Sequence, residues 1–418
     1  MVIVKYCSIF EGKCTNFDLV AMIVDFKKEN DGATLILAGR LDTATSNQVS
    51  ADIDGFLDTA TDISRLTCDT AQLDYISSSG LRILLKLAKR YKDFRIVEVQ
   101  PRVYDVLSTT GFTKIMHVER ALRQFSVEGC EVIGAGGVGT VYRIDGDTII
   151  KVFREGTTVD EVRREITMSK EAFIMGMPTA ISFDIVRVGS QYGLVYELLQ
   201  AETLSTCIRR EPERIDEFAR KYADLFHQLH DIEVPGGSSV PCAKEREQQQ
   251  IRHIRRYFPQ QSIDLMLRIT DAVPDANRLL HLDLQTKNAM VQDGQLMLID
   301  MGEVGYGHPI LDLGHAYSAM VTLVGDYDSI ISMPRELGVS LWNRAIDYYL
   351  EGLPSDVVKQ RKAQIEVISC VRNFSWLALS DSFPEDLVNE CKNLFDERVG
   401  CRKDYILDVC KTFSDWTL

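Results

Sequence analysis

The sequence lacks several features that would restrict where the protein works. No uninterrupted apolar run is long enough to span a bilayer, and no basic segment followed by an apolar one opens the chain. We therefore expect a protein that is neither exported nor embedded in a membrane. The ten cysteines include no C-x-x-C pair and form no zinc pattern with the seven histidines. Reduced thiols and a cytoplasmic location are the expectation that follows.

Positive charge is also scarce. The chain has 47 Lys and Arg residues against 61 Asp and Glu, a formal net charge of −14. An acidic surface repels the phosphates of a nucleic acid unless a basic patch overcomes its field. One basic segment holds Arg252, Arg255 and Arg256, but a solvated helix face explains it more simply than substrate contact does. We predict no nucleic-acid partner.

The composition has enough apolar material for two folded domains. The chain is 418 residues long, and 45% of them are hydrophobic while 26% are charged. This balance is typical of compact soluble domains, and the length suits two buried cores. We predict one domain over residues 1–122 and a second over 123–418.

The most specific chemical pattern is HLDLQTKN at residues 281–288, followed after an apolar run by LIDMG at 298–302. Phosphoryl transfer to a hydroxyl needs a base for the proton and hard oxygen ligands for magnesium. In this spacing Asp283 is the candidate base, and Asn288 and Asp300 are the candidate metal ligands. The pattern indicates a kinase active site.

A glycine-rich segment upstream supplies the other half of such a site. Residues 132–142 read VIGAGGVGTVY, which has the G-x-G-x-x-G-x-V pattern, and an apolar strand with Lys151 follows. Glycines let backbone N–H groups approach phosphate oxygens, and a strand lysine can reach phosphates while pairing with a helix carboxylate, here Glu165. The candidate nucleotide-binding residues of this segment are Gly134, Gly136, Gly139, Val141 and Lys151.

These segments, together with the Gly-His-Pro at 307–309, resemble the aminoglycoside phosphotransferase and choline kinase branch of the kinase-like fold, over roughly residues 126–330. The resemblance implies a two-lobed domain with an N-lobe of about 123–200 and a C-lobe of about 201–418. It also implies ATP and Mg²⁺ as cofactors, with Glu197 and Leu199 in the hinge that receives adenine. Asp283, Lys151 and Glu165 would form its catalytic set.

The first third of the chain resembles a different family. Residues 34–45, 73–85 and 101–112 are similar to a STAS domain of the anti-sigma factor antagonist type. The resemblance implies an α/β domain ahead of the α+β kinase-like domain. In the phosphorylatable members of that family the serine that accepts phosphate immediately precedes the glycine at the start of a helix. The resemblance implies that Ser79 holds this position here.

The serine residues 77–79 have two possible roles, a helix cap or a site for a phosphate. Leu81, Leu84 and Leu85 fall at helical spacing after a buried strand, so residues 77–79 form a strand-to-helix junction. A serine there can cap the helix, which contributes about 1 kcal/mol. The same junction can hold a phosphate, whose charge complements the helix N-terminus.

Three functional classes follow from the sequence. The first is a serine kinase of a partner-switching system, acting on a STAS-domain serine of this chain or another, with an anti-sigma-factor-like protein as partner. The second is a small-molecule phosphotransferase, for an aminoglycoside, sugar or amino alcohol, regulated by its STAS-like domain. The third is a binding module with an inactive kinase domain, against which the intact catalytic set argues.

Overall fold

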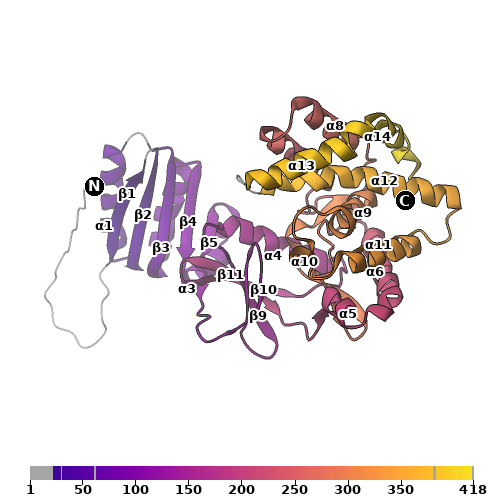
Figure 1. The fold of residues 1–418 in the computed structure, drawn as a ribbon. Coiled ribbons are helices and arrows are strands. Elements are labelled where there is room, and N and C mark those ends of the chain that lie inside the picture. The colour runs from indigo at the N-terminus through magenta and orange to yellow at the C-terminus, as the bar shows by residue number, and fades with distance from the viewer. Residues whose placement is uncertain (1–21, 30, 61–62, 380–382, 417–418) are drawn as a thin grey trace. The chain divides into compact units, whose positions relative to one another are not determined.

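The computed structural model describes residues 22–29, 31–60, 63–379 and 383–416, and divides the chain between Arg123 and Gln124 into two compact units (Figure 1). The beginning of the predicted first domain, residues 1–21, lies outside the described part. Among the described helices none is long and apolar enough to cross a membrane.

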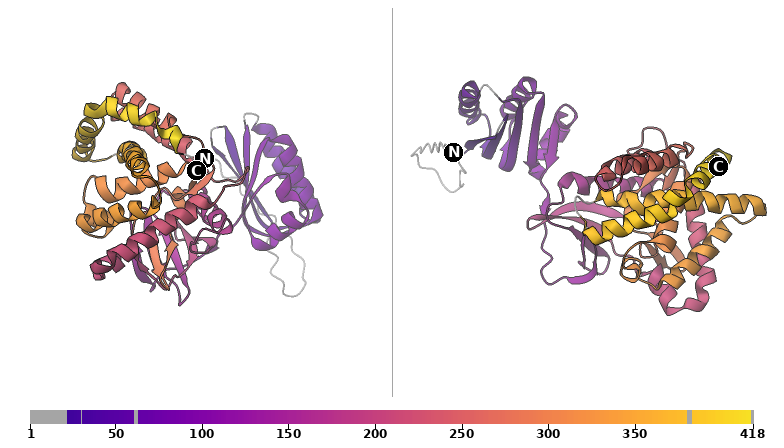
Figure 2. Two further views of the ribbon diagram at one scale, coloured as in Figure 1. Left: turned by 90° about the vertical axis from the view of Figure 1, so that its right-hand side faces the viewer. Right: turned by 45° about the horizontal axis from the view of Figure 1, so that its top comes forward.

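The first unit is a five-stranded sheet in the order β1-β2-β3-β4-β5. β1 is antiparallel to β2, whereas β2 to β5 run parallel, each joined to the next by a helix. Because right-handed crossovers that advance in one direction place their helices on one face, α1, α2 and α3 cover one side of the sheet (Figure 2). The elements are β1 (Ile23–Glu29), β2 (Gly32–Leu41), α1 (Ser46–Thr59), β3 (Arg65–Ile76), α2 (Ser78–Arg90), β4 (Asp93–Val99), α3 (Pro101–Thr109) and β5 (His117–Arg120).

Alternating apolar residues determine which face of this sheet is buried against the helices. Leu35 and Leu37 of β2 are fully buried, and they meet Ile53 of α1 and Leu84 of α2 in one hydrophobic core. Strand residues two apart share a face, and helix residues three or four apart share a side, so the two periodicities bury the same layer. The α/β architecture expected from the sequence is confirmed for this unit.

The N-lobe of the second unit is a six-stranded sheet in the order β6-β10-β11-β9-β8-β7, packed against α4. α4 begins with a capping box in which Thr158 and Glu161 satisfy each other's backbone N–H groups. The elements are β6 (Arg123–Gln124), β7 (Glu131–Ala135), β8 (Gly139–Arg143), β9 (Thr148–Phe153), α4 (Val159–Ile174), β10 (Ser182–Val188) and β11 (Gln191–Glu197).

The C-lobe is helical, with two small sheets that present its loops, β12-β14-β15 and β13-β16. Tyr222, Phe226 and Phe374 lie fully buried in its core. Its strands are β12 (Glu202–Thr203), β13 (Arg278–Leu280), β14 (Ala289–Gln292), β15 (Gln295–Leu298) and β16 (Gly305–Gly307). Its helices are α5 (Leu204–Arg210), α6 (Ile215–Asp231), α7 (Ala243–His253), α8 (Gln260–Asp271), α9 (Pro309–Tyr317), α10 (Tyr327–Ile331), α11 (Arg335–Tyr349), α12 (Ser355–Ser375), α13 (Glu385–Arg398) and α14 (Lys403–Cys410).

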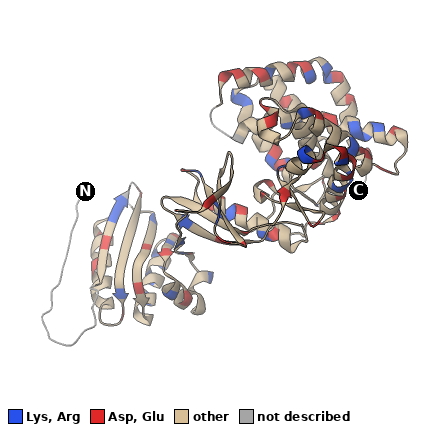
Figure 3. Cartoon of the chain, turned by 60° about the horizontal axis from the view of Figure 1, so that its bottom comes forward, with Lys and Arg blue, Asp and Glu red and all other residues tan. Residues whose placement is uncertain are grey.

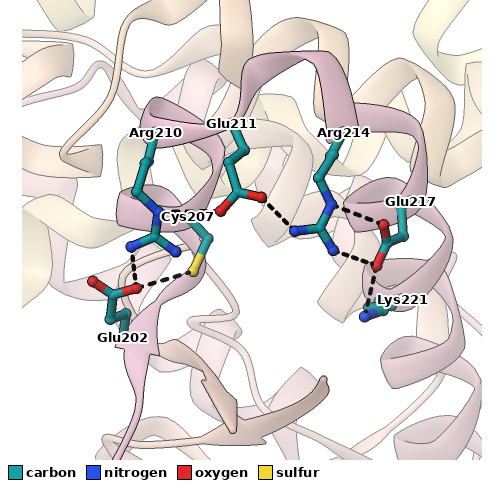
Figure 4. Close-up of polar contacts among 7 residues, drawn as sticks. All are labelled: Glu202, Cys207, Arg210, Glu211, Arg214, Glu217 and Lys221. Atoms are coloured by element: carbon teal, nitrogen blue, oxygen red, sulfur yellow. Dashed lines mark hydrogen bonds and ion pairs between the residues drawn. The ribbon is translucent and has the colours of Figure 1, made fainter. Parts of the chain in front are cut away.

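Charges of both signs alternate along the C-terminal helices (Figure 3). At the α5–α6 junction they form a chain of ion pairs that runs from Glu202 through Arg210, Glu211, Arg214 and Glu217 to Lys221 (Figure 4). Exposed pairs of this kind are screened by water and add little stability. These ion pairs fix side chains on the surface and take no part in the site described next.

Candidate active site

The glycine-rich segment forms the hairpin between β7 and β8. A Cβ at Gly139 would lie 2.2 Å from the carbonyl oxygen of Val152, so only glycine fits where β8 passes β9. A Cβ at Gly136 would meet no atom within 4 Å, so the turn itself is open. Val141 packs on Gly134, 3.7 Å from where a Cβ of that glycine would be. One glycine is therefore needed for strand packing, while the turn glycine leaves space for a ligand.

Lys151 lies on β9 and joins the two lobes. Its Nζ donates to Glu165 Oε1 of α4 at 2.8 Å and to Asp300 Oδ1 at 3.2 Å, and Tyr196 donates its hydroxyl to the same Glu165 oxygen at 2.9 Å. Burial acts to lower the pKa of Lys151, but the charges of Asp300 and Glu165 outweigh it and raise the pKa. The lysine is held charged at the base of the glycine hairpin.

Asp283 and Asn288 meet in the loop between β13 and β14. Asn288 donates its amide to Asp283 Oδ2 at 2.9 Å, and Gln285 donates to Asp283 Oδ1 at 2.8 Å. Burial is the main cause that raises the pKa of Asp283, and the negative charge of Asp300 adds to it. A carboxylate that is oriented at both oxygens and made more basic is suited to take a proton.

Buried hydrogen bonds fix the backbone beneath this carboxylate. Leu282 has a φ of +62°, a conformation that costs a residue with a Cβ about 1–2 kcal/mol. The Asp312 carboxylate accepts from the N–H groups of Leu282 at 2.8 Å and His281 at 3.0 Å. His315 Nδ1 lies 2.9 Å from the Leu282 carbonyl oxygen. These contacts retain the strained conformation.

His315 is itself held by a carboxylate. Its Nε2 lies 3.1 Å from Glu247 Oε2 of α7, and its other ring nitrogen faces a carbonyl oxygen. Burial would raise the pKa of Glu247, but the hydrogen bond and charge of His315 lower it to about 2, so the carboxylate is ionised. Both ring nitrogens of His315 therefore face oxygen atoms.

Asp300 follows β15 and points toward the lysine. Its φ is +64°, and the N–H of the preceding Ile299 donates to the Asn288 carbonyl oxygen at 3.0 Å, which ties the two loops together. Burial opposes ionisation of Asp300, but the charge and hydrogen bond of Lys151 prevail and lower its pKa.

The donor set fits magnesium. Asn288 uses its Nδ2 on Asp283, which leaves its Oδ1 for a cation, and Asp300 has a second carboxylate oxygen beside the one that faces Lys151. Mg²⁺ is usually bound through one or two protein oxygens, substrate phosphates and water. Within the described residues no cluster of three His, Cys, Asp or Glu side chains could hold a metal alone. The site thus suits a metal that arrives with a nucleotide.

The predicted hinge is the segment that leaves β11. Glu197 donates its N–H to the Ile181 carbonyl oxygen at 3.0 Å, and Leu198 donates to the Asp147 carbonyl oxygen at 2.7 Å. The N–H of Leu199 finds no backbone acceptor in the part of the chain that the structure describes. That group is free to donate to an adenine ring.

Sequence reasoning missed the residues that support the loop. Asp312, Gln285, His315 and Glu247 contact the loop or one another, and no sequence pattern assigned them a role. One signal could have indicated Asp312, because a charged residue inside the apolar run 310–313 must have a buried partner.

The junction before α2 divides its roles among three serines. Ser77 is the N-cap, and its hydroxyl accepts from the Gly80 N–H at 3.4 Å. Ser78 is exposed, whereas Ser79 is half-buried and its hydroxyl has no hydrogen-bond partner among the described residues. A Cβ at Gly80 would lie 2.7 Å from Leu41 Cγ, so α2 packs tightly against the sheet here. The cap therefore falls to Ser77, not to Ser79.

Comparison with known proteins assigns both units. Residues 26–125 match the STAS domain family, and residues 129–330 match the family described as phosphotransferase enzymes. This chain is a STAS domain joined to a phosphotransferase domain. The predicted fusion and its fold class are confirmed, and the second unit belongs to an enzyme family.

Parts of the chain are similar to individual known proteins. The chain is 33% identical over 86 residues to BtrV of Bordetella bronchiseptica, named as an anti-sigma factor antagonist; these residues are 20% of this chain and 72% of BtrV. A choline/ethanolamine kinase family structure from Mesorhizobium loti has a TM-score of 0.46 at 14% identity and covers 68% of this chain and 92% of its own. An anti-sigma factor antagonist structure from Mycobacterium paratuberculosis has a TM-score of 0.22 at 17% identity. The match covers 24% of this chain and 86% of that structure.

Proposed function

We propose that the phosphotransferase domain transfers the γ-phosphoryl group of Mg-ATP to a serine of a STAS domain, with Ser79 of this chain or of another copy as the acceptor. In this reaction Asp283 takes the proton of the acceptor hydroxyl as its oxygen bonds to the γ-phosphorus. The bond from that phosphorus to the β–γ bridging oxygen breaks, and ADP leaves. A cytoplasmic setting supplies the ATP.

Other residues have supporting roles in this proposal. Lys151 binds the α- and β-phosphates and is oriented by Glu165, while the hairpin of Gly134, Gly136 and Gly139 covers the phosphates. Asn288 and Asp300 would hold Mg²⁺, which neutralises the charge that develops on the phosphoryl oxygens when it is bound. Adenine would lie against Val141 and receive the Leu199 N–H, with Glu197 beside it.

One observation carries the choice of acceptor. Ser77 caps α2, so the Ser79 hydroxyl is not engaged in holding the helix. A phosphate on Ser79 would sit in the first turn, where the helix N-terminus favours negative charge, and the cap would remain in place. A STAS partner could then read a change of about −1.5 to −2 charges on a folded domain.

Intact mass after incubation with Mg-ATP tests this proposal. The wild-type chain should gain one phosphate, mapped by peptide sequencing to Ser79, and Ser79→Ala should gain none. Ser78→Ala is the matched control, because it removes an exposed hydroxyl one residue away and should still be labelled. A protein that gains no phosphate, but consumes ATP when a sugar or amino alcohol is added, would support the small-molecule phosphotransferase instead.

A mixing experiment tells whether transfer occurs within one chain or between chains. Asp283→Ala keeps the acceptor without the base, and Ser79→Ala keeps the base without the acceptor. If Ser79 is phosphorylated between copies, the Asp283→Ala chain becomes labelled only in the mixture, at a rate that rises with concentration. If transfer is intramolecular, the Asp283→Ala chain stays unlabelled, and labelling of the wild type does not depend on concentration.

A further inference from the structure

An arginine without a partner lies near the catalytic base. Arg372 is in the last turn of α12 and is half-buried, yet its guanidinium makes no hydrogen bond or ion pair with any described residue. α12 packs against α7 and α9, which bring Glu247 and Asp312 beneath the catalytic loop. The positive charge of Arg372 acts to lower the pKa of Asp283, Glu247 and Arg246.

The neighbouring arginine is already engaged. Arg246 of α7 donates to the Val304 carbonyl oxygen at 3.5 Å and to the Glu303 carbonyl oxygen, and its guanidinium lies 3.7 Å from the Glu303 carboxylate. It therefore braces the segment after Asp300. Arg372 has no such task within the described structure.

A second cation without a partner flanks the base. Lys287 is half-buried between Asp283 and Asn288 in the chain, and its charge acts on Asp283 and Asp300. Its ammonium makes no hydrogen bond or ion pair with a described residue.

The described ion pairs leave two cations near Asp283 without a partner. Glu165 and Asp300 both face Lys151, Glu247 faces His315, and Glu303 faces Arg246. No described carboxylate forms an ion pair with Arg372 or Lys287. A cationic acceptor would meet charge of its own sign there, whereas an anionic group would find a free guanidinium, whose fork of donors matches carboxylate and phosphate oxygens.

Gln285 adds an independent sign of a ligand. Its side chain is only 8% exposed, and its Nε2 donates to Asp283, but its Oε1 has no hydrogen-bond partner among the described residues. Buried acceptors are normally satisfied. A donor on the acceptor molecule, held next to the base, would satisfy this oxygen.

We propose that Arg372 binds a carboxylate or phosphate group of the acceptor, next to the hydroxyl that Asp283 deprotonates. The inference rests on the proposed phosphoryl transfer and adds the substrate class, a hydroxyl beside an anion. In a protein acceptor the anion is an acidic or phosphorylated side chain near the serine. In a small acceptor it is a hydroxy acid or a phosphorylated alcohol.

Four small alcohols test the charge preference on the full chain. Glycerol is neutral, choline is cationic, glycerate carries a carboxylate and glycerol 3-phosphate carries a phosphate. With the Ser79→Ala chain as enzyme and the Asp283→Ala chain as protein acceptor, glycerate or glycerol 3-phosphate should be phosphorylated or should slow protein labelling. Glycerol and choline should do neither at the same concentration. Equal effects of all four, or a preference for choline, would overturn the proposal.

Variants of Arg372 assign the preference to this side chain. Arg372→Ala should raise the acceptor KM, or the inhibition constant of the effective anion, at least tenfold, and Arg372→Lys should lie between it and the wild type. The affinity for a fluorescent ATP analogue should not change, which separates acceptor binding from nucleotide binding. Lys359→Ala removes an exposed charge from the same helix and should leave every value as in the wild type. An anion preference that survives Arg372→Ala contradicts the proposal.

A binding measurement keeps the two proposals separable. Glycerate and glycerol 3-phosphate are titrated by calorimetry into the full chain saturated with Mg-ADP, for the wild type and for Arg372→Ala. Failure of all phosphoryl transfer with Arg372-dependent anion binding would reject the proposed function and keep the anion site. Phosphoryl transfer without Arg372-dependent anion binding would keep the proposed function and reject the anion site.

Discussion

The carboxylate of Asp312 accepts a 2.8 Å hydrogen bond from the backbone N–H of Leu282, a residue held at a φ of +62° one position before the candidate base Asp283. Asp312 never faces the acceptor side of the site, because its side chain is fully buried under the loop. The position of the Asp283 carboxylate therefore depends on a group that contacts neither nucleotide nor acceptor.

Asp312→Asn should misplace the base. An amide can accept from only one of the two N–H groups and turns its own donor toward the other, so a buried N–H is left without an acceptor, a loss of about 1–3 kcal/mol. We expect kcat to fall by about 10²-fold, since small displacements of a catalytic group are costly, with a lower melting temperature and little change in nucleotide affinity. Asp328→Asn, on the exposed side of α10, is the control and should match the wild type. Equal kcat values would show that the loop needs no such support.

Replacement of the base should separate transfer from binding. Asp283→Ala and Asp283→Asn remove the proton acceptor but leave Lys151, Glu165 and Asp300 in place. Transfer should fall by about 10²–10⁴-fold, the usual contribution of a general base, while the dissociation constant of an ATP analogue stays within about twofold. A variant that labels its acceptor at the wild-type rate would refute the role of Asp283.

The metal requirement should follow Asp300. Asp300→Asn exchanges a carboxylate for a neutral oxygen and removes one of the two anions that face Lys151. More Mg²⁺ should then be needed for half-maximal nucleotide binding, and the difference should shrink as Mg²⁺ is added in excess. Titrations of Mg²⁺ against a fluorescent ATP analogue measure this shift. Superimposable curves for the two proteins would rule out Asp300 as a ligand.

Mild acid should destabilise the C-lobe through His308. Its Nδ1 accepts from the Ile310 N–H at 3.2 Å and caps α9, its Nε2 lies 3.3 Å from the Trp416 carbonyl oxygen, and burial lowers its pKa from 6.5 to about 4. The unfolded chain takes up the proton first as pH falls, so this stability is present above about pH 6.5 and is lost toward pH 4. Between pH 7 and 5 the loss is about 2 kcal/mol.

His308→Asn tests this, because asparagine can cap the helix and cannot ionise. Urea unfolding of the full chain at pH 7 and pH 5 should show a smaller pH dependence for the variant, by about 2 kcal/mol. The transition to follow is that of the second unit, which contains His308. The same pH dependence in both proteins would mean that His308 titrates normally in the folded state.

The candidate site residues were easier to predict from the sequence than the residues that support them. Asp283, Asn288, Asp300 and Lys151 stand in short motifs, so the sequence alone made them candidates. The structure brings Lys151, Glu165 and Asp300 into direct contact. Glu165 was inferred only as a carboxylate on the next helix. Its contact with Tyr196, 31 positions further on, depends on how α4 packs on the sheet.

The supporting contacts could not have been predicted in the same way. Asp312 and His315 reach Leu282 across about 30 positions, and Glu247 reaches His315 across 68, so no local pattern relates them. For Ser79 a local pattern exists, but it does not distinguish this serine from its neighbours. Three consecutive serines satisfy the same capping pattern, and only the backbone at Ser77, extended at φ −95° and ψ 174°, shows which of them is the cap.

Substitutions at Gly139 and at Gly136 should have different effects in the cell. Any side chain at Gly139 collides with the Val152 carbonyl oxygen, whereas Gly136 has empty space around it. A substitution at the first position should deplete the protein from the cell, and one at the second should leave a full complement of folded chains that handle nucleotide poorly. Comparing the two phenotypes would reveal whether the cell depends on the phosphorylating activity or on the presence of the STAS domain.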